Sequence, residues 1–211
     1  LVQYNKVLLQ RNKLLKELFF KPEYEETLDV WDMQLVNYGR EVIRFRHEFI
    51  DQLNEIIRGI HRSLSGDKEE IEISYEPYTQ EDQLADVLKR NRGQDMKQKT
   101  TLSGPHRDDI SFIVNGIDIR KFGSQGQQRT AALSLKLSEL ELVKRISRDE
   151  PILLLDDVLS ELDSGRQNHL LSAIQNIQTM ITCTGLDDFV NNRFHIDKIF
   201  RVIDGTAQNE N

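Results

Sequence analysis

The sequence predicts an α/β fold with an N-terminal, all-helical antiparallel arm, and three observations support this prediction. From Leu1 to Leu64, apolar residues recur at steps of three and four, the period of an amphipathic helix. At residues 122–129 a polar, glycine-containing loop opens into another helical pattern. An apolar run at residues 151–155 ends in two carboxylates, as the buried strands of a parallel sheet do. We therefore divide the chain into a helical arm domain, residues 1–95, and an α/β lobe, residues 96–211.

Composition limits the classes of protein that are compatible with this chain. Its 211 residues, 38% of them hydrophobic, suffice for one large or two small packed domains. No run of about 18 apolar residues occurs, which excludes a membrane-spanning helix. The net charge of -7 argues against a protein that coats nucleic acid through bulk charge, so any DNA contact needs a local basic patch. The single cysteine, Cys183, cannot form an internal disulfide, and we expect a cytosolic setting. Residues 1–6 lack the apolar segment of a signal peptide and resemble the middle of a helix, so we expect further residues to precede them.

The arm is expected to consist of two antiparallel helices. Apolar positions form a stripe along residues 1–20, and Pro22 ends this first helix. A second stripe covers residues 28–64, and an unbroken helix of that length would reach about 55 Å. Gly39 and Gly59 lie within the second stripe and weaken the prediction of one continuous helix.

A strand, a helix and a hairpin are expected after the long helix. Apolar residues alternate with polar ones over residues 71–75, as in a half-buried strand. Thr79 and Asp82 form a capping-box-like start for a helix that ends near Gly93. Alternating apolar residues flank the Asn-Gly pair at residues 115–116, which is the strongest short-range signal for a hairpin.

The polar glycine loop is the first candidate binding site. Residues 122–129 read FGSQGQQR and lead directly into a helix. Unpaired N–H groups at a helix start, the positive end of the helix dipole and a serine hydroxyl together suit anionic oxygens, typically those of phosphate. The candidate binding residues are Ser124, Gln125, Gly126 and Gln127, with Gly126 allowing a close approach of backbone to ligand. The alternative is an ordinary helix start, in which Ser124 and Gln127 form a capping box.

The second candidate site is the acid pair Asp156 and Asp157. Residues 151–157 read PILLLDD, an apolar strand that ends in these two carboxylates. Ligands of open α/β sheets bind beyond the carboxyl ends of strands, where Asp156 could hold Mg²⁺. Asp157 would then lie beside the reacting phosphate and could act as general base for the attacking water. The alternative is a core strand that ends in solvent-exposed acids.

A third motif follows the acid pair directly. Residues 158–163 read VLSELD and resemble the D-loop that crosses to the partner subunit in ABC ATPases, although Ser160 and Asp163 also suit a helix start. Signature loop, helix, acid-ended strand and D-loop in this order and at this spacing match the C-terminal lobe of an ABC-type ATPase head. Because these motifs occur together, a nucleotide-binding function is favoured over a separate structural explanation for each. Asp163 is therefore added to the candidate nucleotide-binding residues.

The residues of these motifs resemble those of the RecF family. TLSGPHRDD at residues 101–109, GSQGQQRT at 123–130 and LLDDVLSELD at 154–163 are similar to its three C-terminal signatures. The resemblance implies a bacterial, cytoplasmic and nucleoid-associated DNA-repair protein with ATP and Mg²⁺ as cofactors. It further implies dimerisation on ATP and binding to double-stranded DNA or a single-strand/double-strand junction. The implied protein partners are RecR and RecO, with which the family places recombinase on gapped DNA.

Two departures from the wider ABC pattern bear on the chemistry. Asp157 stands where transporter ATPases have glutamate, and its shorter side chain predicts slow hydrolysis. No histidine follows the next apolar run, so Cys183 or Thr184 would stand near the γ-phosphate. We name Thr184 as the candidate and expect the Cys183 thiol to be a small, buried core group. Nucleotide would then act as a slow switch of dimerisation.

The phosphate-binding loop G-x-x-x-x-G-K-[ST] does not occur in this sequence. A signature loop acts in trans on nucleotide held by its partner, so the chain alone should bind ATP weakly and hydrolyse almost none. One alternative function is a non-catalytic module that docks a partner such as RecR. Another is an SMC or Rad50-like ATPase head, for which the arm is short, and a transporter ATPase is disfavoured by the missing histidine.

Some further residues receive structural interpretations. His106 and Arg107 lie in a Gly-Pro turn and are expected to pair with Asp108 or Asp109. Trp31 is expected to be a packing anchor of the arm. Two basic clusters on helices are expected to be solvated faces, with DNA contact as the alternative. They comprise Arg40, Arg44 and Arg46, and Lys89, Arg90 and Arg92.

Overall fold

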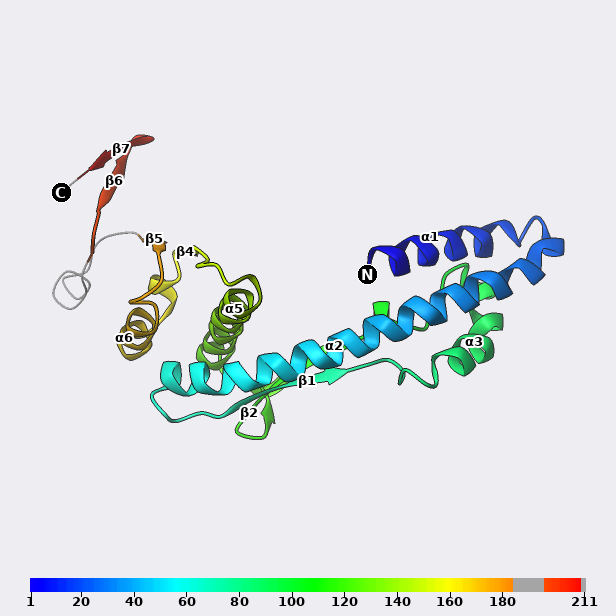
Figure 1. Ribbon diagram of the computed structural model, residues 1–211, viewed down its shortest axis with the longest axis horizontal. Helices are drawn as coiled ribbons and strands as arrows, with labels where there is room; N and C mark the ends of the chain where they lie inside the picture. The colour runs from blue at the N-terminus through cyan, green and yellow to red at the C-terminus, as the bar shows by residue number, and fades with distance from the viewer. Residues whose placement is uncertain (184–195, 210–211) are drawn as a thin grey trace.

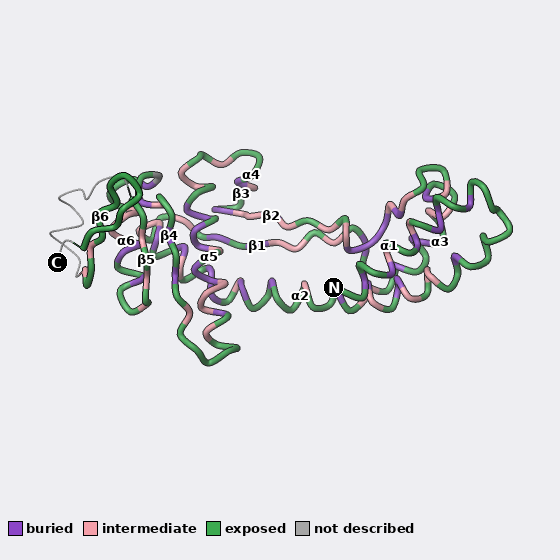
Figure 2. Tube along the Cα trace, turned by 90° about the horizontal axis from the view of Figure 1, so that it is seen from above, coloured by how far each residue is buried: buried purple, intermediate pink, exposed green. Residues whose placement is uncertain are grey.

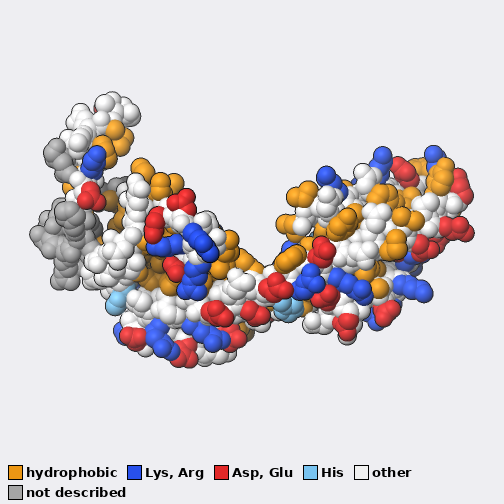
Figure 3. Space-filling model, in the orientation of Figure 1, with side chains coloured by type: hydrophobic (Ala, Val, Ile, Leu, Met, Phe, Trp, Pro, Cys, Tyr) orange, Lys and Arg blue, Asp and Glu red, His pale blue; other side chains and the backbone are white. Residues whose placement is uncertain are grey.

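The chain is built around one long helix, α2 (Leu28–Ser65). The structure is a computed structural model that describes residues 1–183 and 196–209. Helices α1 (Val2–Glu17) and α3 (Leu84–Gln98) lie along the N-terminal part of α2, whereas α5 (Gln125–Ser147) and α6 (Ser164–Ala173) lie at its C-terminal part (Figure 1). The outline is elongated and narrows between these two groups (Figure 3).

The antiparallel arm is confirmed. A 3₁₀ turn, η1 (Pro22–Thr27), reverses the chain, and α1 runs back along α2 (Figure 1). Helix α2 is continuous through both glycines, which confirms the long helix that the apolar stripe predicts. A Cβ placed on Gly39 would lie 2.6 Å from Cδ2 of Leu84, so this glycine lets α3 approach α2 closely.

Helix α2 also joins the apolar clusters of the molecule. It contributes to the cluster at the arm's tip, to the cluster against α1 and α3, to the cluster under the first sheet and to the cluster under β4. Buried segments accordingly follow its whole length (Figure 2). The contributing residues include Leu28, Leu35, Leu53 and Leu64. Trp31 packs against the first two of these clusters, which confirms it as a packing residue.

Helix α3 starts later and ends later than the sequence predicts. It begins at Leu84 without a side-chain cap, so a start at Thr79 was wrong, and it continues through Gly93 to Gln98. A tertiary contact explains the extension, because Asp95 in the last turns is fully buried and pairs with Arg11 of α1 at 2.8 Å. Packing against α1 outweighs the modest cost of one helical glycine.

The first sheet contains the expected strand and hairpin. Strand β1 (Ile71–Glu76) pairs antiparallel with β2 (Asp109–Val114), which pairs with β3 (Ile117–Asp118). The Asn-Gly turn has positive φ at both residues, 49° and 80°, the geometry of a type I′ hairpin turn. A short helix, α4 (Ile119–Phe122), follows. Because β1 precedes residue 95 and β2 follows it, the sheet spans the proposed division between arm and lobe, and that division stays a prediction.

The second sheet confirms the parallel strand. Strand β4 (Leu153–Asp156) pairs parallel with β5 (Thr179–Thr182), and the 3₁₀ turn η3 (Leu159–Glu161) leads from β4 toward α6. Burial on both faces was expected, yet Leu154 is 68% exposed and Met180 is 65% exposed. The reason is that, within the described residues, the packed helices meet only the face that carries Leu153 and Leu155.

The described C-terminal residues form a separate antiparallel pair, β6 (Phe200–Ile203) and β7 (Thr206–Asn209). No helix in the described ranges combines the length and the apolar composition that crossing a bilayer requires.

Candidate nucleotide site

The glycine loop forms a capped helix start. Ser124 is the N-cap of α5, and its Oγ accepts a hydrogen bond from the Gln127 N–H at 3.2 Å. In return, the Ser124 N–H donates to Oε1 of Gln127 at 3.0 Å. The capping-box alternative is therefore confirmed, but it leaves ligand-binding capacity unused. Capping uses the oxygen of Ser124 as an acceptor, which leaves the hydroxyl proton available, and the N–H of Gln125 lies in the first turn, where a helix offers no acceptor.

Arg166 brings this loop next to Asp163, the last residue of the VLSELD segment. A Cβ placed on Gly126 would lie 2.8 Å from Nη1 of Arg166, so the end of this flexible side chain lies against Gly126. The same Nη1 donates to Oδ2 of Asp163 at 3.0 Å. Asp163 also caps α6, and the hydrogen bond from the Arg166 N–H, together with the nearby guanidinium, holds the pKa of its carboxyl below the usual value. Two candidate residues are thus joined through a cation that the sequence analysis did not single out.

The acid pair lies at the open end of the second sheet. Asp156 and Thr182 are register partners on β4 and β5, and the Thr182 hydroxyl donates to Oδ1 of Asp156. The N–H of Asp157 points to both the carbonyl oxygen and Oγ1 of Thr182, each at 3.1 Å. Asp157 has φ of 52°, in the left-handed region that aspartate tolerates better than most residues do. Both aspartates are exposed, so the strand ends in two accessible carboxylates, of which that of Asp156 accepts a hydrogen bond from Thr182.

The oxygens at this end of the sheet suit Mg²⁺. That ion prefers carboxylate and other hard oxygen ligands, and it is commonly held by one or two carboxylates plus water and phosphate. Asp156 and Thr182 supply such oxygens side by side. Within the described part of the chain, no group of three or more His, Cys, Asp or Glu side chains is placed to hold a metal.

The position after β5 is only partly described. Thr184 lies outside the described residues, so its place near a γ-phosphate stays a prediction. The expectation for Cys183 was wrong, because it is exposed. It lies one residue past the end of β5, beyond the part of the strand that packs on the helices.

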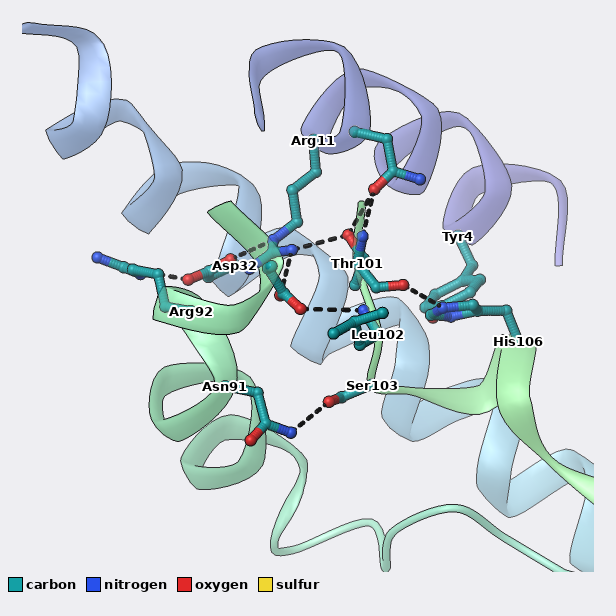
Figure 4. A network of polar contacts seen from close by, with 11 residues as sticks. Tyr4, Arg11, Asp32, Asn91, Arg92, Thr101, Leu102, Ser103 and His106 are labelled. Atoms are coloured by element: carbon teal, nitrogen blue, oxygen red, sulfur yellow. Dashed lines mark hydrogen bonds and ion pairs between the residues drawn. The ribbon is translucent and has the colours of Figure 1, made fainter. Parts of the chain in front are cut away.

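The TLSGPHRDD segment is held by a buried polar network of the arm (Figure 4). The fully buried Arg11 donates to Asp95 at 2.8 Å and to Oγ1 of Thr101 at 2.7 Å. Nε2 of His106 lies 3.0 Å from the Thr101 carbonyl oxygen, and its Nδ1 lies 2.7 Å from the Tyr4 hydroxyl. Because a carbonyl only accepts, Nε2 must carry the proton, and Nδ1 then accepts from Tyr4.

The expected pairing of His106 with a neighbouring aspartate was therefore wrong. Asp108 instead accepts from Arg46 at 2.7 Å and from the Tyr75 hydroxyl. Two other arginines of the basic clusters are also engaged: Arg40 donates to the carbonyl oxygen of Glu81 at 3.2 Å, and Arg92 pairs with Asp32 at 2.6 Å. These contacts favour a structural role for the three arginines over a DNA-facing role.

Comparison with known proteins shows similarity along the whole chain. It is 55% identical over 208 residues to the DNA replication and repair protein RecF of Agathobacter rectalis and 56% identical over 213 residues to that of Lachnospira eligens, which covers 99% and 100% of the chain. The RecF protein of Clostridium perfringens is 45% identical over 213 residues. The chain spans only 58–59% of the length of these relatives.

Solved structures agree with the sequence relatives. The structure of the recombination mediator protein RecF-ATP in the RecFOR pathway superposes with a TM-score of 0.84 at 35% identity, over 99% of this chain and 57% of that one. The corresponding structure with an ATP analogue superposes with a TM-score of 0.83 at 34% identity. No protein-family model matches the chain.

Proposed function

The chain belongs to the RecF family over the part of the protein that it spans, and on that premise we propose that the intact protein is an ATP-dependent, DNA-binding recombination mediator in DNA gap repair. Its nucleic-acid partner is double-stranded DNA or a single-strand/double-strand junction, and its protein partner is RecR, acting with RecO. It works in the bacterial cytoplasm, at the nucleoid. Support comes from relatives named for DNA replication and repair, and from neighbours solved with ATP or an analogue.

The signature loop acts in trans, on nucleotide held by a second copy. Ser124, Gln125, Gly126 and Gln127 bind its phosphate oxygens through the hydroxyl proton and the N–H groups of the first turn of α5. Asp163 lies beside this loop across Arg166 and contributes to the same contact. The observation that carries this proposal is the position of Arg166 at an exposed helix start, where it pairs with Asp163 and lies against Gly126.

The acid pair carries the chemistry of a slow ATPase. Asp156, oriented by the Thr182 hydroxyl, holds Mg²⁺, and this ion when bound neutralises phosphate charge. Asp157 orients and deprotonates the attacking water as general base. Thr184 lies near the γ-phosphate. Because the chain contains no phosphate-binding loop of the G-x-x-x-x-G-K-[ST] kind, it binds ATP weakly by itself and hydrolyses almost none.

The trans contact is tested in the intact protein by ATP-dependent self-association, measured by analytical ultracentrifugation. Ser124→Arg places a large cation at the N-cap of α5 and should abolish association while ATP binding to each copy persists. The matched control is Ser147→Arg at the exposed C-terminal end of the same helix. Asp157→Asn should retain association and lose at least about 100-fold in turnover, the usual scale of a general base. Association that survives Ser124→Arg would overturn the trans role, and an ATP-independent complex with RecR would then favour a docking module.

A further inference from the structure

The signature loop is anchored from outside its own helix. The Gln127 side chain uses both ends of its amide: Oε1 accepts from the Ser124 N–H, and Nε2 donates to Oε1 of Glu69 at 3.1 Å. Glu69 lies in the short connection between α2 and β1, and only 13% of its side chain is exposed. A change at Glu69 is therefore transmitted to the N-cap serine through one side chain.

Glu69 is in turn held by a buried histidine. Its Oε2 lies 3.3 Å from Nε2 of His61, a residue of α2 that is fully buried. On the other side of the ring, Nδ1 lies 2.9 Å from Oγ of Ser134 on α5. His61 of α2 is thus linked to α5 twice, through Glu69 to Gln127 and directly to Ser134.

The hydrogen-bond network determines which ring nitrogen of His61 carries a proton. The Ser134 hydroxyl donates its single proton to the Thr130 carbonyl oxygen at 2.7 Å, so Nδ1 of His61 must donate to Ser134. Without a further proton, Nε2 of His61 and Oε2 of Glu69 would face each other as two acceptors. Neither atom is exposed to solvent, and neither makes a hydrogen bond.

The electrostatic surroundings of His61 act in opposite directions. Burial lowers the pKa of His61, the Glu69 carboxylate raises it, and the nearby Arg166 lowers it. The groups that surround the imidazole thus come from α2, from α5, from α6 and from the connection after α2. This convergence makes His61 the point where the signature helix, the D-loop helix and α2 meet.

We propose that His61 and Glu69 are positioning residues for the signature serine, Ser124. Through these two residues, the position of α2 determines the position of the signature loop. This proposal rests on the proposed trans role of the loop. Helix α2 extends 38 residues from the arm to this contact (Figure 1). A partner that displaces the arm would act on the nucleotide site through α2, His61 and Glu69 in turn.

The positioning is tested first without nucleotide, by NMR on the 211-residue chain. In Glu69→Ala, solvent exchange of the capping-box amides of Ser124 and Gln127 should be about tenfold faster, the scale of one lost hydrogen bond. Glu69→Gln should restore protection, because its amide can accept from Gln127 and donate to Nε2 of His61. Glu70→Ala is the matched control, since the Glu70 side chain is 78% exposed and pairs with Arg62. Unchanged exchange in Glu69→Ala would overturn the proposal.

The consequence for assembly is tested in the intact protein. Glu69→Ala should weaken ATP-dependent self-association about tenfold, and it should add little to the effect of Ser124→Ala, because coupled residues are non-additive. Full additivity, or association unaffected by Glu69→Ala, would refute the link to assembly. If the unaltered protein does not associate on ATP, the proposed function fails, whereas the exchange experiment still decides the positioning role.

Discussion

The Thr182 hydroxyl donates a hydrogen bond to Oδ1 of Asp156, so the last residue of β5 orients the carboxylate that ends β4. Thr182→Val removes the donor and keeps the branched shape. In the intact protein we expect Mg²⁺-dependent ATP turnover to fall about 10- to 100-fold, the range for loss of a group that orients a metal ligand. The measurement is steady-state ATPase activity against Mg²⁺ concentration. Thr179→Val is the control, because its hydroxyl bonds to the Ile177 carbonyl oxygen at the opposite end of β5.

The Arg11–Asp95 pair should be a major source of stability in the arm. Both side chains are fully buried, so Asp95→Ala takes a charged hydrogen-bond partner from buried Arg11, which keeps Asp32 at 2.6 Å, and should cost about 1–3 kcal/mol. Urea denaturation followed by fluorescence of the single tryptophan, Trp31, reports on this part of the chain. Glu17→Ala breaks the exposed Lys13–Glu17 pair and should cost no more than about 0.5 kcal/mol. Equal losses in the two variants would contradict a special role for the buried pair.

Acidification should destabilise the arm through His106. Burial lowers the pKa of this imidazole from its ordinary 6.5. In the folded chain Nδ1 also stays unprotonated, because it accepts a hydrogen bond from Tyr4. The unfolded chain therefore binds a proton more readily, and the stabilisation is complete above pH 6.5 and lost as pH falls through the folded pKa. His106→Gln should reduce the slope of stability against pH in this window. His61, whose pKa is also lowered, accounts for part of the slope that remains.

Removing the cap of α6 should affect both stability and the signature loop. Asp163→Ala deletes the acceptor of the Arg166 N–H and should cost about 1 kcal/mol, whereas Asp163→Asn should retain most of the cap. Because the pKa of Asp163 is lowered, its contribution is present above the unfolded value of 3.8 and is lost as pH falls through the folded value. Thermal unfolding at neutral and acidic pH compares the three proteins. A loss in Asp163→Asn as large as in Asp163→Ala would show that charge, not capping, matters.

Local spacing in the sequence was sufficient for the elements that are stabilised locally. The long amphipathic stripe of α2, the Asn-Gly turn, the apolar run of β4 and the capping box at Ser124 all depend on residues a few positions apart. Such patterns can be read from the chain because the partners of each residue are its near neighbours. The C-terminal end of α3 could not be predicted from local spacing, because it depends on Arg11, which lies 84 positions before Asp95.

The candidate site also has parts that the sequence predicts and parts that only the tertiary structure shows. The sequence by itself was enough to select residues 122–129, the acid pair and residues 158–163 as candidates, because each is a short contiguous motif. Only the tertiary structure decided that Thr182 orients Asp156, that Arg166 joins Gly126 to Asp163, and that Glu69 and His61 hold Gln127. Each of these partners is a common polar residue with no local pattern, and it acquires its role because folding places it against a distant buried group that requires a hydrogen bond.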